Sequence, residues 1–567
     1  MRDLFAVLIR HFFGRFFDNE LVSTQGEAHA TISKAIGLLA TPGLICFWLM
    51  PKYTALAMQQ PKFAEVASLP DKMFFITFGM VVMGFVTVLE WDALFPDRRD
   101  FTILIPLPIR LPMIFAAKIL SLVIFVLMFF VAVNAIHTFF YPFIAMGRYA
   151  LFLGVLGSIG VHGSVMLAAT AFMFFFFVAL QGLLMNLLPF RLFRRMSIYV
   201  QLVAVFALLM MLLLFLDTSS LLHSARSRNL LYFFPPMWFL GLYESMLGQP
   251  EPLAGCREIA LRATAIVTIG SALAYAISYK RHVKRSLESE EILDVVPSRI
   301  SRLLCSIANR WIVRHPLEQA AFYFAGKTLV RSRKHWLYLA TYVGVGFALM
   351  LQALFGVFSR TGNSALGLPS ASLLSIPLII SFFVLSGMRV VFAIPAELSA
   401  NWVFQLSGAG GSIECLSGTR KVMFVFGVLP LFIALAPVYS LLWGWTAAVF
   451  HTFFDVVLSL LLIELLLVKF HKIPFTCSYL PGKSNLTALW FVYWLGFSIY
   501  AYSMASAEAW ILRHPLAMIA GFAAGCAAIA AAYFYRNQHL AEGFALIFDD
   551  QPDPVVRTLD LSAPGTW

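Results

Sequence analysis

Ionisable and strongly polar residues interrupt the long apolar stretches of this sequence, and chemistry could occur at these positions. The sharpest cases are Asp455 and Glu464, both within HTFFDVVLSLLLIELLLVKF. An ionisable group at the centre of a bilayer costs about 2.5 to 3.5 kcal/mol, so such residues commonly mark ion or substrate pathways. The competing interpretation is helix–helix hydrogen bonding, and Glu464 can also pair with Lys469. The further pathway candidates are Asn134 and His162, with His137, Gln181 and Asn186 beside them.

Other chemical motifs are incomplete. The fragments AAFYFAGKT, ending at Thr328, and CSYLPGKS, ending at Ser484, resemble phosphate-binding loops, but Ala321 and Cys477 replace the first glycine that wraps the phosphate. The fragment LSGAGGS at Leu406 resembles an ATPase signature loop and has no Walker motif with it. The six cysteines are widely spaced, and no histidine lies at zinc-ligand spacing. We therefore expect no catalytic residues, cofactor, metal, disulfide framework or ATP hydrolysis in this chain.

The composition is that of a membrane protein. Of the 567 residues, 60% are hydrophobic and 12% are charged, whereas soluble domains carry roughly 25% charged residues. Long uncharged runs alternate with short Lys and Arg clusters, which indicates transmembrane helices and not the short alternating strands of a barrel. The net charge of +12 is scattered over loop edges. It therefore favours lipid phosphates and membrane orientation over nucleic acid as its explanation.

Apolar runs of about 20 residues predict an all-α polytopic protein with twelve transmembrane helices. The apolar run from Val422 to Val468 is too long for one transmembrane helix, so the chain must reverse within it. The predicted position of this turn is Trp443 to Thr446. The first six helices are predicted at Ile32 to Met50, Phe74 to Leu89, Met113 to Thr138, Val165 to Leu188, Met196 to Leu216 and Ile259 to Ser278. The second six are predicted at Trp336 to Phe355, Leu373 to Phe392, Val422 to Leu442, Ala447 to Val468, Leu486 to Met504 and Ala517 to Phe534.

Charge asymmetry sets the orientation. With both termini cytoplasmic, 31 of the 41 Lys and Arg fall on the inner side, as the positive-inside rule requires. The resulting domains are an N-terminal cytoplasmic amphipathic segment (1–31), a first six-helix half (32–279), a basic cytoplasmic linker with a second amphipathic segment (280–335), a second six-helix half (336–535) and a cytoplasmic tail (536–567). In the first segment Leu4, Phe5, Leu8, Phe12 and Phe16 share one side, which predicts a helix lying on the membrane.

The order of elements in the two halves indicates an internal repeat. Each begins with an amphipathic segment and has a polar connection after its second helix, and Asp97 in one connection lies 300 positions before Glu397 in the other. A half with an even number of spans begins and ends on the same side of the membrane. The two halves of six helices therefore have the same orientation and form two parallel pseudo-repeats. Between the fifth and sixth helices Pro235 and Pro236 interrupt an apolar segment. A proline pair stops a continuous helix, so this segment is expected to cap the bundle or dip into the outer leaflet.

The cytoplasmic connection between the second and third helices is unusually charged. The stretch from Leu89 to Leu120 holds four acidic and four basic residues. Lipid headgroups would favour Lys and Arg without matching acids, so the balance favours a protein partner that buries an apolar ridge and pairs with the charges. The residues at issue are Asp97, Arg98, Arg99, Asp100 and Arg110.

The order of these elements resembles the permease subunits of type II ATP-binding-cassette exporters. The stretches LFPDRRDFTILIPLPIRLPMIFAAKIL, KTLVRSRKHWLYLA and IPAELSANWVFQLS are similar to bacterial permeases in which two such halves are fused. The resemblance implies a bacterial inner-membrane location, separate ATPase subunits as partners, and rocking of the halves driven by ATP. It implies ATPase coupling through Asp97 to Arg110 and, in the second half, through Glu397, Asn401 and Trp402. In that family a re-entrant or capping segment lies between the fifth and sixth helices of each half. The second half of this chain departs from the family there, because its loop, about Ala505 to Leu516, is very short.

Two alternatives remain. A proton-coupled transporter of the major facilitator class also has twelve helices in two parallel halves and would depend on Asp455 or Glu464. The sequence LFPDRRDFTILIPLPIR shares an Asp-Arg pair with that class and lacks its two glycines. A non-transport membrane scaffold is the other alternative, since no catalytic constellation emerges. The substrate is unknown, and the aromatic, nearly uncharged interior suits a lipid or amphiphile better than an ion.

Overall fold

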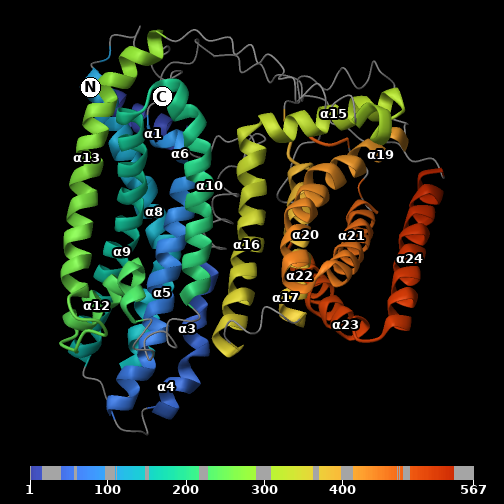
Figure 1. Cartoon of the computed structure of the whole chain (residues 1–567). Helices are drawn as coiled ribbons and strands as arrows, with labels where there is room; N and C mark the ends of the chain where they lie inside the picture. Colours follow the sequence, from blue (N-terminus) through green and yellow to red (C-terminus); the bar gives the residue numbers. More distant parts are fainter. Residues whose placement is uncertain are drawn as a thin grey trace. The chain divides into compact units, whose positions relative to one another are not determined.

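The computed structural model describes residues 2–15, 40–56, 61–95, 109, 111–146, 152–215, 228–288, 308–361, 369–396, 413–468, 470, 473–476 and 486–541. Within these ranges every regular element is a helix, which confirms the all-α fold (Figure 1). The chain divides into two compact units. Unit 1 comprises Met1–Val295 and Phe347–Gln352, and unit 2 comprises Val296–Gly346 and Ala353–Trp567.

The described part of unit 1 contains a bundle of five long helices, in which α9 contacts the other four. Its core includes Met83, Phe125, Phe174 and Tyr275, which come from four different helices. Aromatic residues supply much of this core, since each buries a large apolar area. The five helices are α5 (Pro61–Leu89), α8 (Leu111–Met146), α9 (Phe152–Leu187), α10 (Phe190–Leu214) and α13 (Cys256–Glu288).

Short elements flank α5 in the chain. Before it come η1 (Thr41–Leu44), α3 (Ile45–Trp48) and α4 (Met50–Leu56), which pack mainly along α8. After it comes the single turn α6 (Trp91–Leu94), whose Trp91 and Leu94 are fully buried. The described part of the first predicted span is therefore a series of short helices that lie against α8.

The proline-interrupted segment caps unit 1. The turn η3 (Arg228–Phe233) is followed by Phe234, whose extended backbone precedes α12 (Pro235–Met246). The two prolines occupy the first helical positions, where the missing N–H costs nothing. α12 buries Met237, Phe239 and Leu240 and packs against α5, α9 and α13. Figure 1 shows it at the end of the unit opposite α1, where it covers the bundle, one of the two arrangements expected.

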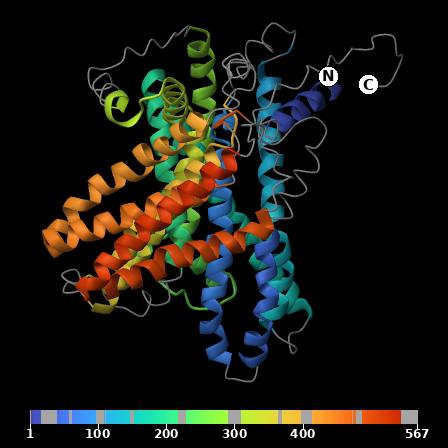
Figure 2. The ribbon, with the colours of Figure 1, turned by 90° about the vertical axis from the view of Figure 1, so that its right-hand side faces the viewer.

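The N-terminal helix α1 (Arg2–Arg15) packs against the beginning of α8. Leu8 and Phe12 are buried against Ile114 and Ala117, and Lys118 Nζ lies 5.1 Å from the centre of the Phe12 ring. Figure 2 shows α1, in dark blue, crossing the bundle direction. The predicted apolar face of α1 is therefore present. Its buried residues contact apolar side chains at the start of α8, whereas the sequence predicted a helix lying on the membrane.

Unit 2 is built around α17 (Ala371–Val391), which contacts α21, α20, α23 and two π-helical turns. Its core cluster includes Leu385, Met388, Met423 and Ile463. The remaining helices are η4 (Ala308–Ile312), α15 (Pro316–Arg331), α16 (Arg333–Thr361), α19 (Ile413–Val422), η8 (Met423–Val428), α20 (Leu429–Trp443), α21 (Trp445–Leu467), α22 (Leu486–Ser498), η9 (Ile499–Ser503), α23 (Met504–Ile511) and α24 (Pro515–Ala541).

The amphipathic helix α15 packs against α19, as α1 packs against α8. The approach is close at Gly418, where an added Cβ would lie 2.8 Å from the Glu318 carbonyl oxygen. The contact is also polar, because Lys421 Nζ lies 2.7 Å from Glu318 Oε1 and Ser417 Oγ donates to the same oxygen at 2.5 Å. Only glycine at position 418 permits this approach without displacing α15.

The expected reversal between the ninth and tenth helices is confirmed. α20 ends at Trp443 and α21 begins at Trp445, and Gly444 joins them with φ +82 and ψ 167. This backbone region is essentially restricted to glycine. A single residue therefore reverses the chain here.

Ten helices in the described part of the chain are long and apolar enough to cross a membrane, so the protein is a multi-pass membrane protein. Two predicted spans are not among the ten. Residues 32–39 of the first lie outside the described ranges. The eleventh, from Leu486, is helical to Ile511 but is divided by the π-helical turn η9.

The residues predicted to couple to ATPase subunits lie outside the described ranges. This holds for Asp97, Arg98, Arg99, Asp100, Arg110, Glu397, Asn401 and Trp402. Their roles remain predictions. The helices on either side of both connections are described, and these fix where each connection begins and ends.

Candidate functional site

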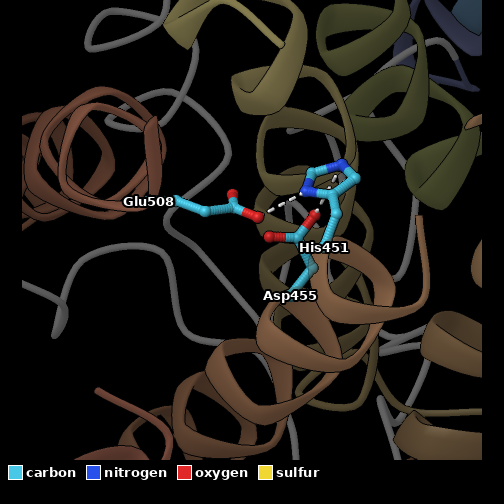
Figure 3. A group of neighbouring side chains, drawn as sticks. All are labelled: His451, Asp455 and Glu508. Carbon is cyan, nitrogen blue, oxygen red and sulfur yellow. Dashed lines mark hydrogen bonds and ion pairs between the residues drawn. The ribbon is translucent and has the colours of Figure 1, made fainter. Parts of the chain in front are cut away.

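Asp455, the first pathway candidate, belongs to a buried cluster with His451 and Glu508. His451 and Asp455 lie one helical turn apart on α21, and Glu508 reaches them from α23 (Figure 3). His451 Nδ1 is 2.7 Å from Glu508 Oε1, and His451 Nε2 is 3.5 Å from Asp455 Oδ2. All three side chains are 0 to 1% exposed. The cluster thus joins two helices through ionisable groups.

Much of the hydrogen-bonding capacity of this cluster is unused. Both carboxylate oxygens of Asp455, Glu508 Oε2 and His451 Nε2 are buried without a hydrogen-bond partner. In the described part of the chain, no Lys or Arg forms an ion pair with Asp455 or Glu508. An ionised carboxylate is costly to bury without a cation, and an unpaired buried acceptor is costly even when neutral. Protonation of a carboxyl group or binding of a cation would remove this cost.

Aromatic residues of α20 close the site on one side. The ring of His451 lies edge-on to Tyr439 and Trp443, with centroid distances of 4.6 Å and 5.5 Å. Apolar side chains that include Leu374, Phe454 and Ala505 pack around the cluster. These walls exclude water and strengthen any electrostatic interaction within the site.

Glu464, the second candidate on α21, has a different environment. Arg420 Nη1 from α19 lies 2.7 Å from Glu464 Oε1, with the carboxylate side chain 4% exposed. Its suggested partner Lys469 lies outside the described residues. The ion pair favours the interpretation of Glu464 as a helix–helix contact, because its charge is already neutralised.

In unit 1, His162 lies in a chain of hydrogen bonds that crosses three helices. His162 Nε2 is 2.9 Å from His137 Nδ1, and His162 Nδ1 is 3.2 Å from the Tyr243 hydroxyl. The ring of Phe75 stacks on His137 at 4.5 Å. Both histidines are buried. The pair thus links α8 and α9 to the capping helix α12.

Asn134, Gln181 and Asn186 each bond to a backbone carbonyl. Asn134 Nδ2 donates to Phe130 O at 2.9 Å, and Gln181 Nε2 donates to Trp91 O at 2.7 Å. Asn186 Nδ2 donates to Ala274 O at 3.3 Å, across α9 and α13. The last two join separate elements, so they fit the helix-contact interpretation.

A second set of charges, not predicted from the sequence, lies in the first half of α5. Lys72 Nζ is 2.8 Å from Glu244 Oε1 on α12, and both residues are buried. On the neighbouring residue, Asp71 Oδ2 accepts hydrogen bonds from Lys52 Nζ at 2.6 Å and from the Tyr53 hydroxyl at 2.8 Å. These contacts fasten α4 and α12 to α5.

Of the two fragments that resemble phosphate-binding loops, the structure describes the first, and that one is helical. Gly326 to Thr328 lies inside α15, and a Cβ at Gly326 would contact the Phe426 ring at 3.0 Å. A helix interior uses its backbone N–H groups internally, so this fragment cannot cradle a phosphate. Lys483 and Ser484 lie outside the described ranges, as does the fragment at Leu406.

Sequence reasoning found Asp455 and missed its partners. His451 stands one turn before Asp455, a spacing visible in HTFFD. Glu508 lies 57 positions away from His451, and no local pattern connects them. The available signal was that SAEAW places an isolated acid in an otherwise apolar helix end.

Comparisons of this chain with protein families, curated proteins and solved structures find no match.

Proposed function

We propose that this protein is the permease subunit of an ATP-binding-cassette exporter. It forms the membrane pathway and couples through cytoplasmic connections to separate ATPase subunits, since the chain carries no ATPase motifs of its own. The proposal rests on the resemblance in element order. One structural correspondence supports it most strongly: the amphipathic helices α1 and α15 each pack on the helix that follows a charged connection, α8 and α19 respectively.

That correspondence also supports the layout of twelve helices in two parallel six-helix repeats. The first connection lies between α6 and α8 and the second between α17 and α19. In both units the helix after the connection receives the amphipathic helix on its first turns, through Leu8 and Phe12 in one and Glu318 in the other. A repeated architecture of this kind gives two equivalent sites for two ATPase subunits.

The second connection has a fixed base from which force could pass into unit 2. The backbone N–H of Phe475 donates to Phe392 O at 2.9 Å, and the N–H of Ala396 donates to Phe475 O at 3.0 Å. His335 Nε2 also lies 3.1 Å from Ile394 O. Residues 392 to 396 are thus held directly before the connection begins. A rigid attachment is needed if ATPase movement is to rotate helices and not merely stretch a loop.

The charge distribution supports an orientation in the bacterial inner membrane with both termini in the cytoplasm. The substrate proposed is a lipid or amphiphile, because the packed cores of both units are apolar and rich in aromatic residues. The capping helix α12 fits this arrangement, since an exporter needs a closed outer end until release.

Affinity purification of the tagged chain in mild detergent, from the organism that encodes it, tests the proposal. We expect a co-purifying subunit with Walker and signature motifs. Charge reversal at the first connection, with Asp97→Arg, Arg98→Glu, Arg99→Glu and Asp100→Arg combined, is expected to release that subunit. The matched control reverses the exposed pair Glu258 and Arg262, whose atoms are 2.8 Å apart. Retention of the ATPase after the first reversal would contradict the proposed docking site.

A proton-coupled transporter of the major facilitator type is the second candidate, and the His451, Asp455 and Glu508 cluster is the observation that favours it. Such a carrier needs a buried group that gains and loses a proton during transport. Asp455→Asn separates the candidates, since it removes the titrating carboxyl with little change of shape. The carrier loses transport in this variant, whereas the ATP-driven exporter retains it, as measured by complementation of a strain that lacks the gene.

A further inference from the structure

We propose that His451, Asp455 and Glu508 bind a divalent transition-metal ion of the zinc class. The proposal is independent of how transport is powered. It contradicts the expectation from the sequence that the chain has no metal site. That expectation considered cysteines and local histidine spacing, whereas this site takes Glu508 from a distant helix.

The geometry brings one ligand atom from each residue together. These atoms all lie within 4.8 Å of one another. Bonds of about 2.0 to 2.2 Å to one ion place its ligand atoms roughly 3 to 3.5 Å apart in a tetrahedral site. The Nε2 to Oδ2 distance of 3.5 Å between His451 and Asp455 already meets that spacing. Glu508 Oε1 lies 2.7 Å from the other ring nitrogen, His451 Nδ1, so the third ligand atom is its unpartnered oxygen Oε2.

The charge of the cluster calls for a divalent cation. Two ionised carboxylates and one neutral imidazole carry a charge of about −2, which one divalent ion neutralises. Among the described residues no lysine or arginine pairs with either carboxylate. Asp455 provides an independent observation, because its side chain is 0% exposed and both its oxygens lack hydrogen-bond partners. A bound ion would satisfy these atoms.

The ligand types select the ion. Magnesium and calcium ions are bound by oxygen ligands, so the imidazole nitrogen of His451 disfavours both ions. Copper(I) prefers thiolate and thioether ligands, and these three residues offer none. One imidazole and two carboxylates suit zinc, with manganese(II) as a weaker relative in the same series.

The site lies at the end of unit 2 where two helix connections occur. His451 stands about two helical turns after Gly444, and Glu508 is in the last turn of α23. A bound ion would fix α21 to α23 at this end. Three protein ligands leave a fourth position free, which a water molecule can occupy.

The test measures zinc in the full-length protein, purified in mild detergent, stripped with chelator and then dialysed against Zn²⁺. We expect about one ion per chain by elemental analysis, and little Mg²⁺ under the same conditions. Asp455→Asn and His451→Ala are expected to weaken zinc binding at least about 100-fold, and Glu508→Gln about 10- to 100-fold. The control is His514→Ala, since His514 is exposed at the same end of the unit.

Zinc should also raise the thermal midpoint of the wild-type protein and of His514→Ala, but not that of Asp455→Asn. This second measurement keeps the test valid if a variant misfolds, because the shift in the thermal midpoint of the wild-type protein does not depend on any variant. Absence of zinc uptake by the wild-type protein overturns the proposal. So does zinc uptake that survives Asp455→Asn and His451→Ala but falls with His514→Ala, since that marks surface binding only.

Discussion

Lys72 Nζ on α5 lies 2.8 Å from Glu244 Oε1 on α12, and both side chains are almost fully buried. The ammonium group also lies 5.0 Å from the centre of the Tyr243 ring. Removing one partner of a buried pair leaves an uncompensated charge, at a cost of about 3 to 5 kcal/mol. We therefore expect Lys72→Met or Glu244→Leu to lower the free energy of unfolding by that amount, measured by unfolding in detergent.

The double variant Lys72→Met with Glu244→Leu provides the check. Apolar residues of similar volume commonly replace a buried ion pair without loss, so the double variant should recover most of the stability. The exposed pair of Glu258 and Arg262 serves as the control, and its disruption should cost no more than about 1 kcal/mol. Additive losses in the double variant would show that the two side chains do not stabilise α12 as a pair.

The contact of α15 with α19 should depend on pH through Glu318. Burial alone would raise the pKa of Glu318, but the hydrogen bonds from Lys421 and Ser417 and the charge of Lys421 lower it below its ordinary value. A lowered pKa in the folded state contributes stability above the unfolded pKa of about 4.3, and this is lost as pH falls through the folded value.

We therefore expect the protection factors of the α15 amides, corrected for the intrinsic pH dependence of exchange, to stay constant from neutral pH down to about pH 5 and to fall at more acidic pH. In Glu318→Gln this acid-dependent loss should disappear, because position 318 no longer titrates. An equal acid-dependent loss in the Gln variant would assign it to another group.

Gly444 should tolerate no side chain. Its φ of +82 and ψ of 167 lie in a region that costs other residues about 1 to 3 kcal/mol, although no atom lies within 4 Å of an added Cβ. Gly444→Ala is thus expected to lower the thermal midpoint through backbone strain alone. Gly496→Ala is the matched control, since Gly496 also has open space but lies inside the helix α22. There alanine should be neutral or stabilising, by up to about 1 kcal/mol. Equal effects at both positions would contradict the explanation from strain.

The sequence predicted the apolar helices well, because hydropathy and length are local properties. It placed a turn within Trp443 to Thr446 because the apolar run is too long for one span, and an interruption at Pro235 and Pro236 because a proline pair stops a helix. It did not predict the π-helical turn at Ile499–Ser503, since hydropathy does not report helix winding. Lys72 was missed because its stretch reads as a polar loop, and its burial depends on Glu244 from a distant helix. Asp455 was found from its type alone, whereas Glu508 required the fold.

The most direct test of the proposed function is the mass of the complex that the protein forms in mild detergent. Light scattering with mass spectrometry should find one chain of 63.4 kDa together with two ATPase subunits, one for each charged connection. Reversal of the charges at Asp97 to Asp100 should leave at most one. A chain that purifies without any ATPase, and that moves its substrate in vesicles on an ion gradient alone, would contradict the proposal.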